Sequence, residues 1–227
     1  LLDPGARLWT SCHVVPERWV LESNAGDTGG AYQWLLDLVF GAHDAAAHAV
    51  AEAAMAGATP EARQVVCHLG PVVFNLGDMS PFKPAGFLFR FPLLHVDRPS
   101  RGDVLRAFME SVAFAVRGNW EQIAAVSGHT LSALHASGGM TQSPTLVAAL
   151  ANTLGVPVRV ATVPESASLG SAILAAVGAG LHPTIPEAVA AMVRVRTVHP
   201  EPTRGAEYDQ RYRKWRGVYD TLQTWTL

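Results

Sequence analysis

The glycine pair Gly138-Gly139 constrains the fold of this chain more than any other feature. It lies between an apolar run at 131–136 and a helix-like segment that Ser143 and Pro144 open. Two adjacent glycines remove both Cβ atoms, so the backbone can adopt positive φ and a ligand can approach it without a steric clash. Serine is a good N-cap, and proline fits the first helical position. The pattern predicts a strand, a tight turn and a helix start, whose backbone N–H groups can bind a phosphate or nucleotide.

A strand-to-helix turn without any ligand explains the same residues, so the rest of the chain has to be considered. Apolar residues at helical spacing predict helices over 29–40, 44–55, 102–126, 144–154, 168–179, 186–192 and 207–225. Short apolar runs predict two strands within 8–21 and further strands at 64–69, 87–91, 131–136 and 156–160, with 193–198 either a strand or an exposed connector. Strands that alternate with helices indicate an α/β domain.

Two of the expected helices carry distinctive side chains. In 102–126 one apolar stripe is formed by Val104, Phe108, Val112, Val116 and Ile123, with Trp120 beside it. In 207–225 aromatic residues recur every three or four positions next to a basic run at 211–216. A packed aromatic stripe with a solvated basic face explains this helix better than a nucleic-acid patch does.

Composition narrows the class of protein. The chain has 227 residues, of which 49% are hydrophobic, so it can bury a substantial core. Its net charge of −2 provides no electrostatic footprint for nucleic acid or an anionic membrane. No apolar run approaches the roughly 18 residues that span a bilayer, and we expect a cytoplasmic protein. Cys12 and Cys67 each precede a histidine without the spacing of a zinc site, and we predict neither a disulfide nor a metal site.

A second polar loop, at 24–30, runs directly into the first expected helix. Gln33 follows about one turn into that helix. The unpaired N–H groups and positive dipole end of a helix N-terminus suit a phosphate or a polarised base. A helix that is simply capped by Asp27 or Thr28 explains the loop equally well.

The chain shows no catalytic constellation such as GxSxG, a P-loop lysine, HExxH or GxGxxG. The aspartates near loops are Asp27, Asp78, Asp97 and Asp103. The long irregular loop at 70–86 has the polar members Asn75, Asp78 and Lys83, and it is either a functional loop or a surface excursion. Glu165, just before a helix, is assigned a structural role. These residues alone identify no base.

Three stretches resemble the C-terminal domain of the FGGY family of carbohydrate kinases. They are GGAYQWLLD at 29–37, ASGGMTQSPTLVAALANTLGVPV at 136–158 and ESASLGSAILAAVGAG at 165–180. The resemblance implies a ribonuclease H-like (actin-like ATPase) fold, with a mixed sheet flanked by helices, and a single nucleotide-binding domain over 1–227. It also implies transfer of the γ-phosphate of ATP, with Mg²⁺, to a hydroxyl of a sugar, ketose or polyol.

The same resemblance assigns nucleotide-binding residues. In the family a helix-start glycine and the glutamine one turn later line the ATP site, which places Gly29 and Gln33 there. The later glycine turn faces the adenosine part, which adds Gly138 and Gly139. The polar residue four places further on is Ser143. The two loops are thus expected to close on one nucleotide.

Two segments of this chain depart from the family pattern, and other family features are expected upstream of Leu1. Pro92-Leu93 and the segment NLGDMSP at 75–81 depart from the family signatures. In the family the catalytic aspartate and a Gly-Thr turn precede the segment that Leu8 begins to match, so the base is expected upstream of Leu1. The implied partners are a carbohydrate substrate and an N-terminal, sugar-binding kinase domain, without which the chain is expected to be inactive and prone to form a homodimer.

Two other interpretations compete with a kinase half. A noncatalytic nucleotide-binding or protein-interaction module, derived from a kinase fragment, fits the same residues and needs no catalytic aspartate. A Rossmann-type enzyme is disfavoured, because the glycine turn comes late in the chain and lacks the third glycine of the dinucleotide fingerprint.

Overall fold

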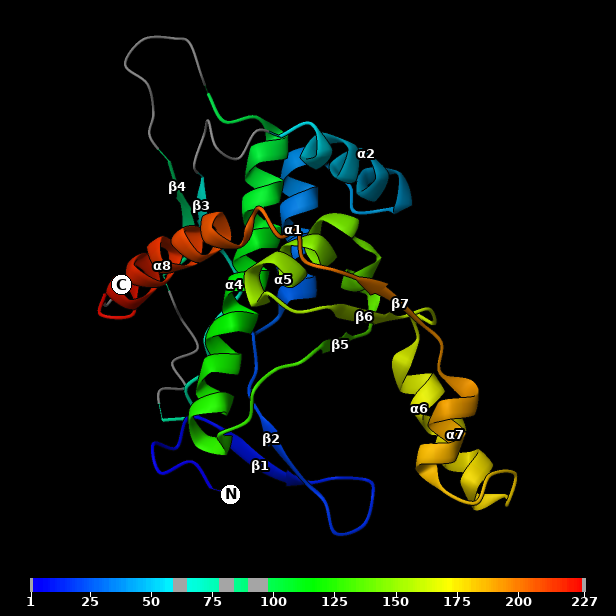
Figure 1. Ribbon diagram of the computed structural model, residues 1–227. Coiled ribbons are helices and arrows are strands. Elements are labelled where there is room, and N and C mark those ends of the chain that lie inside the picture. The colour runs from blue at the N-terminus through cyan, green and yellow to red at the C-terminus, as the bar shows by residue number, and fades with distance from the viewer. Residues whose placement is uncertain (1, 59–64, 78–83, 90–97, 226–227) are drawn as a thin grey trace.

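The structure is a computed structural model, and it describes residues 2–58, 65–77, 84–89 and 98–225. Its helices, shown in Figure 1, are α1 (Thr28–Phe40), α2 (Ala45–Ala56), α4 (Arg101–Ser127), α5 (Pro144–Leu154), α6 (Ser166–Gly178), α7 (Ile185–Met192), α8 (Gly205–Leu222) and the 3₁₀ helix η1 (Gly139–Gln142). Its strands are β1 (Trp9–Cys12), β2 (Trp19–Glu22), β3 (Val66–His68), β4 (Gly86–Leu88), β5 (Leu134–Ala136), β6 (Val158–Ala161) and β7 (Val195–Val198).

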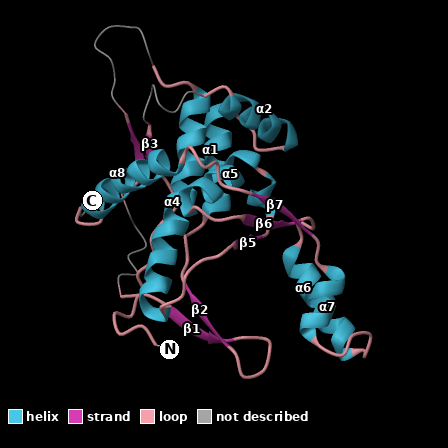
Figure 2. Cartoon of the chain, viewed as in Figure 1, coloured by secondary structure: helices cyan, strands magenta, loops and turns pink. Residues whose placement is uncertain are grey.

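The strands form three small sheets. β1 and β2 pair as an antiparallel hairpin, and β3 pairs antiparallel with β4. The third sheet has the order β5-β6-β7, in which β5 runs parallel to β6 and β7 runs antiparallel to it. A parallel pair requires a crossover connection, and α5 provides it between β5 and β6. The expected mixed sheet with flanking helices is confirmed (Figure 2).

Most of the predicted elements occur within a few residues of their expected bounds. The segment at 193–198 is a strand, β7, and not only a connector. The expected strand at 87–91 is shorter, because β4 ends at Leu88 and residues 90–91 lie outside the described part of the chain. In the predicted loop, residues 70–77 contain no helix or strand, and residues 78–83 lie outside the described residues.

The long helix α4 is the structural centre of the molecule (Figure 1). It packs against α1, α2, α5, α8 and β3. The prediction of one apolar stripe on this helix is wrong. Phe108 and Val112 are buried as expected, but so are Ala107 and Phe114 on other sides of the helix. Neighbours on several sides therefore bury most of the residues between Leu105 and Ala115.

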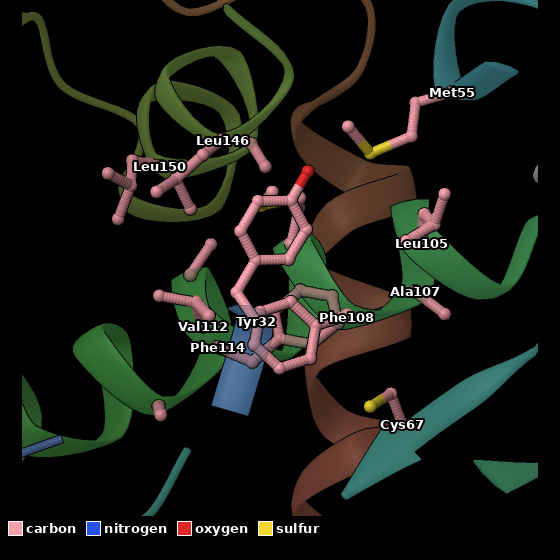
Figure 3. Close-up of a cluster of buried hydrophobic side chains, with 14 of the residues drawn as sticks. Tyr32, Met55, Cys67, Leu105, Ala107, Phe108, Val112, Phe114, Leu146 and Leu150 are labelled. Carbon is pink, nitrogen blue, oxygen red and sulfur yellow. The ribbon is translucent and has the colours of Figure 1, made fainter. Parts of the chain in front are cut away.

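The core between α1, α2, α4 and α5 is aromatic and aliphatic. The rings of Tyr32 and Phe108 stack with centroids 5.5 Å apart. Met55, Leu105 and Leu146 surround them (Figure 3). Each large apolar side chain that is fully buried contributes about 1.5–3 kcal/mol, so this cluster is a major source of the stability of the domain.

Helix α8 covers a different side of α4 with aromatic side chains. Tyr208, Tyr212, Trp215 and Tyr219 are all buried, which confirms the predicted aromatic stripe. The indole Nε1 of Trp215 donates a hydrogen bond to the carbonyl oxygen of Cys67 in β3 over 2.9 Å. Because this contact joins residues 148 positions apart, α8 is an integral part of the core.

Helices α6 and α7 pack mainly against each other. Figure 1 shows this pair extending away from the other helices, beyond β6 and β7. Ile173 and Ala188 are buried, whereas Leu174 and Leu181 are exposed. Helix α6 carries no charged side chain. In the described part of the chain, no helix combines the length and the hydropathy that crossing a bilayer requires.

Candidate functional site

The glycine turn has the predicted strand-turn-helix geometry. β5 ends at Ala136, and Gly138 follows with φ +96°, in the region that favours glycine. Gly139 then begins η1. Ser143 caps α5, because its Oγ accepts a hydrogen bond from the N–H of Leu146 over 3.1 Å. The serine cap and the following proline therefore fix where α5 starts, directly after the turn.

In the glycine turn, the carbonyl oxygen of Gly138 has hydrogen-bond partners within the protein. The backbone N–H and the side-chain hydroxyl of Thr141 both donate to the carbonyl oxygen of Gly138, over 3.1 and 2.7 Å. By contrast, the N–H groups of residues 137–140 have no acceptor among the residues that the structure describes. A Cβ atom built on Gly138 or Gly139 meets nothing within 4 Å. The turn thus presents free N–H donors beside open space, which is the arrangement that binds an anion or the polar edge of a base.

The second predicted segment, at the start of α1, is a capped helix. The carboxylate of Asp27 accepts a hydrogen bond from the N–H of Gly30 over 2.9 Å. A Cβ on Gly30 would lie 2.2 Å from this carboxylate, so the cap requires glycine there. A Cβ on Gly29 meets nothing within 4 Å, and Gln33 is exposed. The capped-helix interpretation is therefore confirmed, and it leaves one face of the helix start open.

Helix α2 lies between the two segments. The ring of His48 in α2 is 5.4 Å from that of Tyr32 in α1. One turn further along α2, Glu52 accepts a hydrogen bond from the hydroxyl of Thr145 in α5 over 2.8 Å. The two helix starts therefore belong to one packed unit, and their joint use by one ligand is part of the proposal below.

The aspartates near loops have structural roles where they are described. Asp103 forms a capping box with Ser100, whose N–H and hydroxyl both donate to its carboxylate over 2.7 and 2.6 Å. Asp27 caps α1, as described above. Asp78 and Asp97 lie outside the described residues, as does Lys83.

Two further polar candidates lie at a turn and at a helix start. Asn75 accepts a hydrogen bond from the N–H of Gly77 over 3.0 Å, within its own turn. Glu165 occupies the N-cap position of α6, without a side-chain hydrogen bond to the helix.

The two Cys-His pairs lie in different surroundings. Both cysteines are free, with Cys12 exposed and Cys67 buried. Burial raises the pKa of the Cys67 thiol to about 12 and lowers the pKa of His68 to about 4. Within the described ranges, no three histidine, cysteine, aspartate or glutamate side chains converge in a way that could hold a metal ion.

A cavity of about 240 Å³ between β3, α4 and α8 has no signal in the sequence, because distant segments form it. Phe114 and Trp215 line it together with Glu110, which is buried and bonded to Arg106 and Arg211. Burial raises the pKa of Glu110, whereas the two guanidinium groups act in the opposite direction. None of the five predicted nucleotide-binding residues lines this cavity. Arg211, which lines the cavity, is paired with both Glu110 and Glu207.

Comparison with known proteins assigns the chain to a protein family. The family model described as "FGGY family of carbohydrate kinases, C-terminal domain" matches residues 3–179. The chain belongs to this family, as the kinase C-terminal domain.

Individual relatives agree with this assignment. The chain is 29% identical over 225 residues to autoinducer-2 kinase of Salmonella choleraesuis (strain SC-B67), which covers 96% of this chain and 42% of the relative. The crystal structure of xylulose kinase from Rhodospirillum rubrum matches with a TM-score of 0.77 and 30% identity, over 97% of this chain and 43% of that one. Plasmodium falciparum glycerol kinase, crystallised with ADP, matches with a TM-score of 0.74 and 17% identity, over 98% and 43% of the two chains. The chain thus spans well under half the length of these relatives, and its fold is that of the FGGY sugar kinases.

Proposed function

We propose that residues 1–227 form the nucleotide-binding domain of an ATP-dependent carbohydrate kinase. The complete enzyme would transfer the γ-phosphate of ATP to a hydroxyl of a sugar, ketose or polyol. The names of the relatives, autoinducer-2 kinase and xylulose kinase, favour a small polyhydroxylated substrate. Within this domain Gly29, Gln33, Gly138, Gly139 and Ser143 are assigned to the nucleotide.

The observation that carries the proposal is the open side of the glycine turn. Its free N–H groups and the absence of Cβ atoms at Gly138 and Gly139 leave room for the flat face or polar edge of an adenosine. The oxygen of Ser143 already accepts from Leu146, but its hydroxyl hydrogen remains available to donate to a ligand. At the start of α1, Gly29 and the exposed Gln33 would form the opposing side of the same cleft.

The chain would position the nucleotide, while other groups complete the reaction. Phosphoryl transfer depends mainly on positioning and electrostatic stabilisation, which come from both halves of such an enzyme. The base that accepts the proton of the substrate hydroxyl, and most of the sugar pocket, would come from the N-terminal kinase domain. Since no carboxylate cluster fits a metal in the described residues, Mg²⁺ would be held by the phosphates and by that domain. The chain alone would bind the nucleotide without catalysing phosphoryl transfer.

Isothermal titration of the chain with Mg-ATP and Mg-ADP tests this proposal. The informative variant is Gly139→Trp, because its side chain would enter the open space beside the turn without meeting protein atoms within 4 Å. The matched control is Gly217→Trp on α8, where a Cβ also meets nothing within 4 Å and the residue is exposed. We expect saturable binding by the wild type and the control, and at least a tenfold loss in Gly139→Trp.

Two results would contradict the proposal. Equal affinity of Gly139→Trp and Gly217→Trp would remove the glycine turn from the site. No saturable binding by the wild type at millimolar nucleotide would mean that this chain does not bind nucleotide by itself. Far-UV circular dichroism of both variants checks that neither substitution has unfolded the chain.

A further inference from the structure

Arg196 in β7 reaches across the sheet to the glycine turn. In the strand register, Ala136 of β5 lies opposite Val160 of β6, which in turn lies opposite Arg196. Directly paired residues project to the same face of a sheet, so Arg196 shares a face with the last residue of β5. That residue is only two positions before Gly138.

A chain of hydrogen bonds connects Arg196 with Gly138. Nη2 of Arg196 donates to the carbonyl oxygen of Thr141 over 3.1 Å, although the two residues are 55 positions apart. Thr141 is buried, and its N–H and hydroxyl both donate to the carbonyl oxygen of Gly138. The guanidinium therefore holds η1, and η1 holds the carbonyl side of the turn.

This arrangement determines which side of the turn is available to a ligand. With the Gly138 carbonyl tied to Thr141, the free N–H groups of 137–140 remain on the other side. A charged donor gives a stronger hydrogen bond than a neutral one, so the anchor from Arg196 is suited to keep η1 in place. Nothing in the local sequence of the glycine turn specifies this anchor, because it comes from a strand that follows α7.

We infer that Arg196 is a positioning residue for the nucleotide site, which keeps the glycine turn in its ligand-ready conformation. The inference rests on the proposed function. Its role is to orient Thr141 and Gly138 and not to contact the phosphates. Loss of the Arg196 side chain should therefore weaken the binding of adenosine and of ADP by the same factor, whereas loss of a phosphate contact would weaken the binding of ADP alone.

The structure offers a matched control two residues away. Arg194 is also exposed, and among the residues that the structure describes its Nη1 donates only within its own segment, to the carbonyl oxygens of Ala190 and Val193. Arg194→Gln and Arg196→Gln change the net charge equally, but only the second removes the anchor to η1. Arg196→Lys keeps the charge without the planar, extended donor.

The experiment titrates adenosine and Mg-ADP into the wild type, Arg194→Gln, Arg196→Gln and Arg196→Lys. We expect Arg196→Gln to lower the affinity for both ligands by about five- to tenfold and Arg196→Lys to lower it by a smaller factor. Arg194→Gln should bind both ligands with the affinity of the wild type. In the same proteins without ligand, hydrogen exchange at the hydrogen-bonded amides of Thr141 and Ser143, which donate to the carbonyl oxygens of Gly138 and Met140, should be faster in Arg196→Gln than in Arg194→Gln.

Each contrary result has a defined meaning. Unchanged hydrogen exchange at the amides of Thr141 and Ser143 in Arg196→Gln overturns the inference whatever the ligands do. Unchanged affinity, a loss confined to Mg-ADP, or an equal loss in Arg194→Gln also overturns it, since each contradicts positioning of the turn. Failure of the wild type to bind either compound, by contrast, removes the proposed function itself and with it any nucleotide role for Arg196.

Discussion

Replacing Trp215 by phenylalanine is expected to destabilise the whole domain. Trp215 is only 1% exposed, and its ring stacks on Tyr219 and on His68 with centroids 5.0 and 5.4 Å apart. Its Nε1 donates to the carbonyl oxygen of Cys67. Phenylalanine keeps most of the stacking but loses this donor and part of the ring volume.

The expected loss follows from these two changes. A buried carbonyl that loses a hydrogen-bond donor costs about 1–3 kcal/mol, and the smaller ring leaves space that adds to this cost. We therefore expect the free energy of unfolding to fall by about 3 kcal/mol. For a domain of this size, each kcal/mol corresponds to about 2–4 °C in Tm, so Tm should fall by about 6–12 °C.

Urea unfolding and thermal melts followed by circular dichroism measure both quantities. The matched control is Trp34→Phe on α1, because Trp34 is 53% exposed and its loss should change the free energy of unfolding by less than about 0.5 kcal/mol. If the two variants unfold at the same urea concentration and temperature, then α8 is not part of the core, and the proposed single domain over 1–227 is refuted.

Two further predictions concern stability. Asp103→Ala removes the carboxylate of the capping box with Ser100 and should lower the free energy of unfolding by about 1–2 kcal/mol, seen as a lower urea midpoint with an unchanged m-value; an unchanged midpoint would contradict the role of the box. Burial lowers the pKa of His68 to about 4, so protonation favours the unfolded chain, and stability should be complete above pH 6.5 and fall by about 3 kcal/mol as the pH drops toward 4. His68→Phe cannot be protonated, so its loss of stability between pH 7 and about 4.5 should be smaller than that of the wild type, and an equal loss in both would show that other groups cause the acid sensitivity.

The sequence could predict the elements whose signals are local. Ser143 and Pro144 mark the start of α5 because a cap and an N1 proline act within one helical turn. The aromatic spacing from Tyr208 to Tyr219 likewise predicts a buried helix face. For the same reason, the position of the glycine turn between β5 and α5 follows from the sequence alone.

Features that depend on distant residues could not be predicted in this way. The single stripe assigned to 102–126 was wrong because periodicity shows which side of a helix is most apolar, not how many neighbours surround the helix. Phe114, on another side of α4, is buried against the aromatic rings of α8. His68 looked like an ordinary neighbour of Cys67, but α8 buries it from more than 140 positions away. The anchor from Arg196 to Thr141 depends on strand register, which no local pattern specifies.

The contact between Trp215 and β3 also affects how the protein is made. The indole partner of Cys67 leaves the ribosome 148 residues after Cys67 itself, and the hydrogen bond between Tyr219 and the N–H of Val73 spans 146 residues. Contacts that close such long loops form late and slow folding. The nascent chain must therefore carry an uncovered aromatic and aliphatic surface along α4 until α8 has left the ribosome, which gives chaperones a long interval in which to bind it.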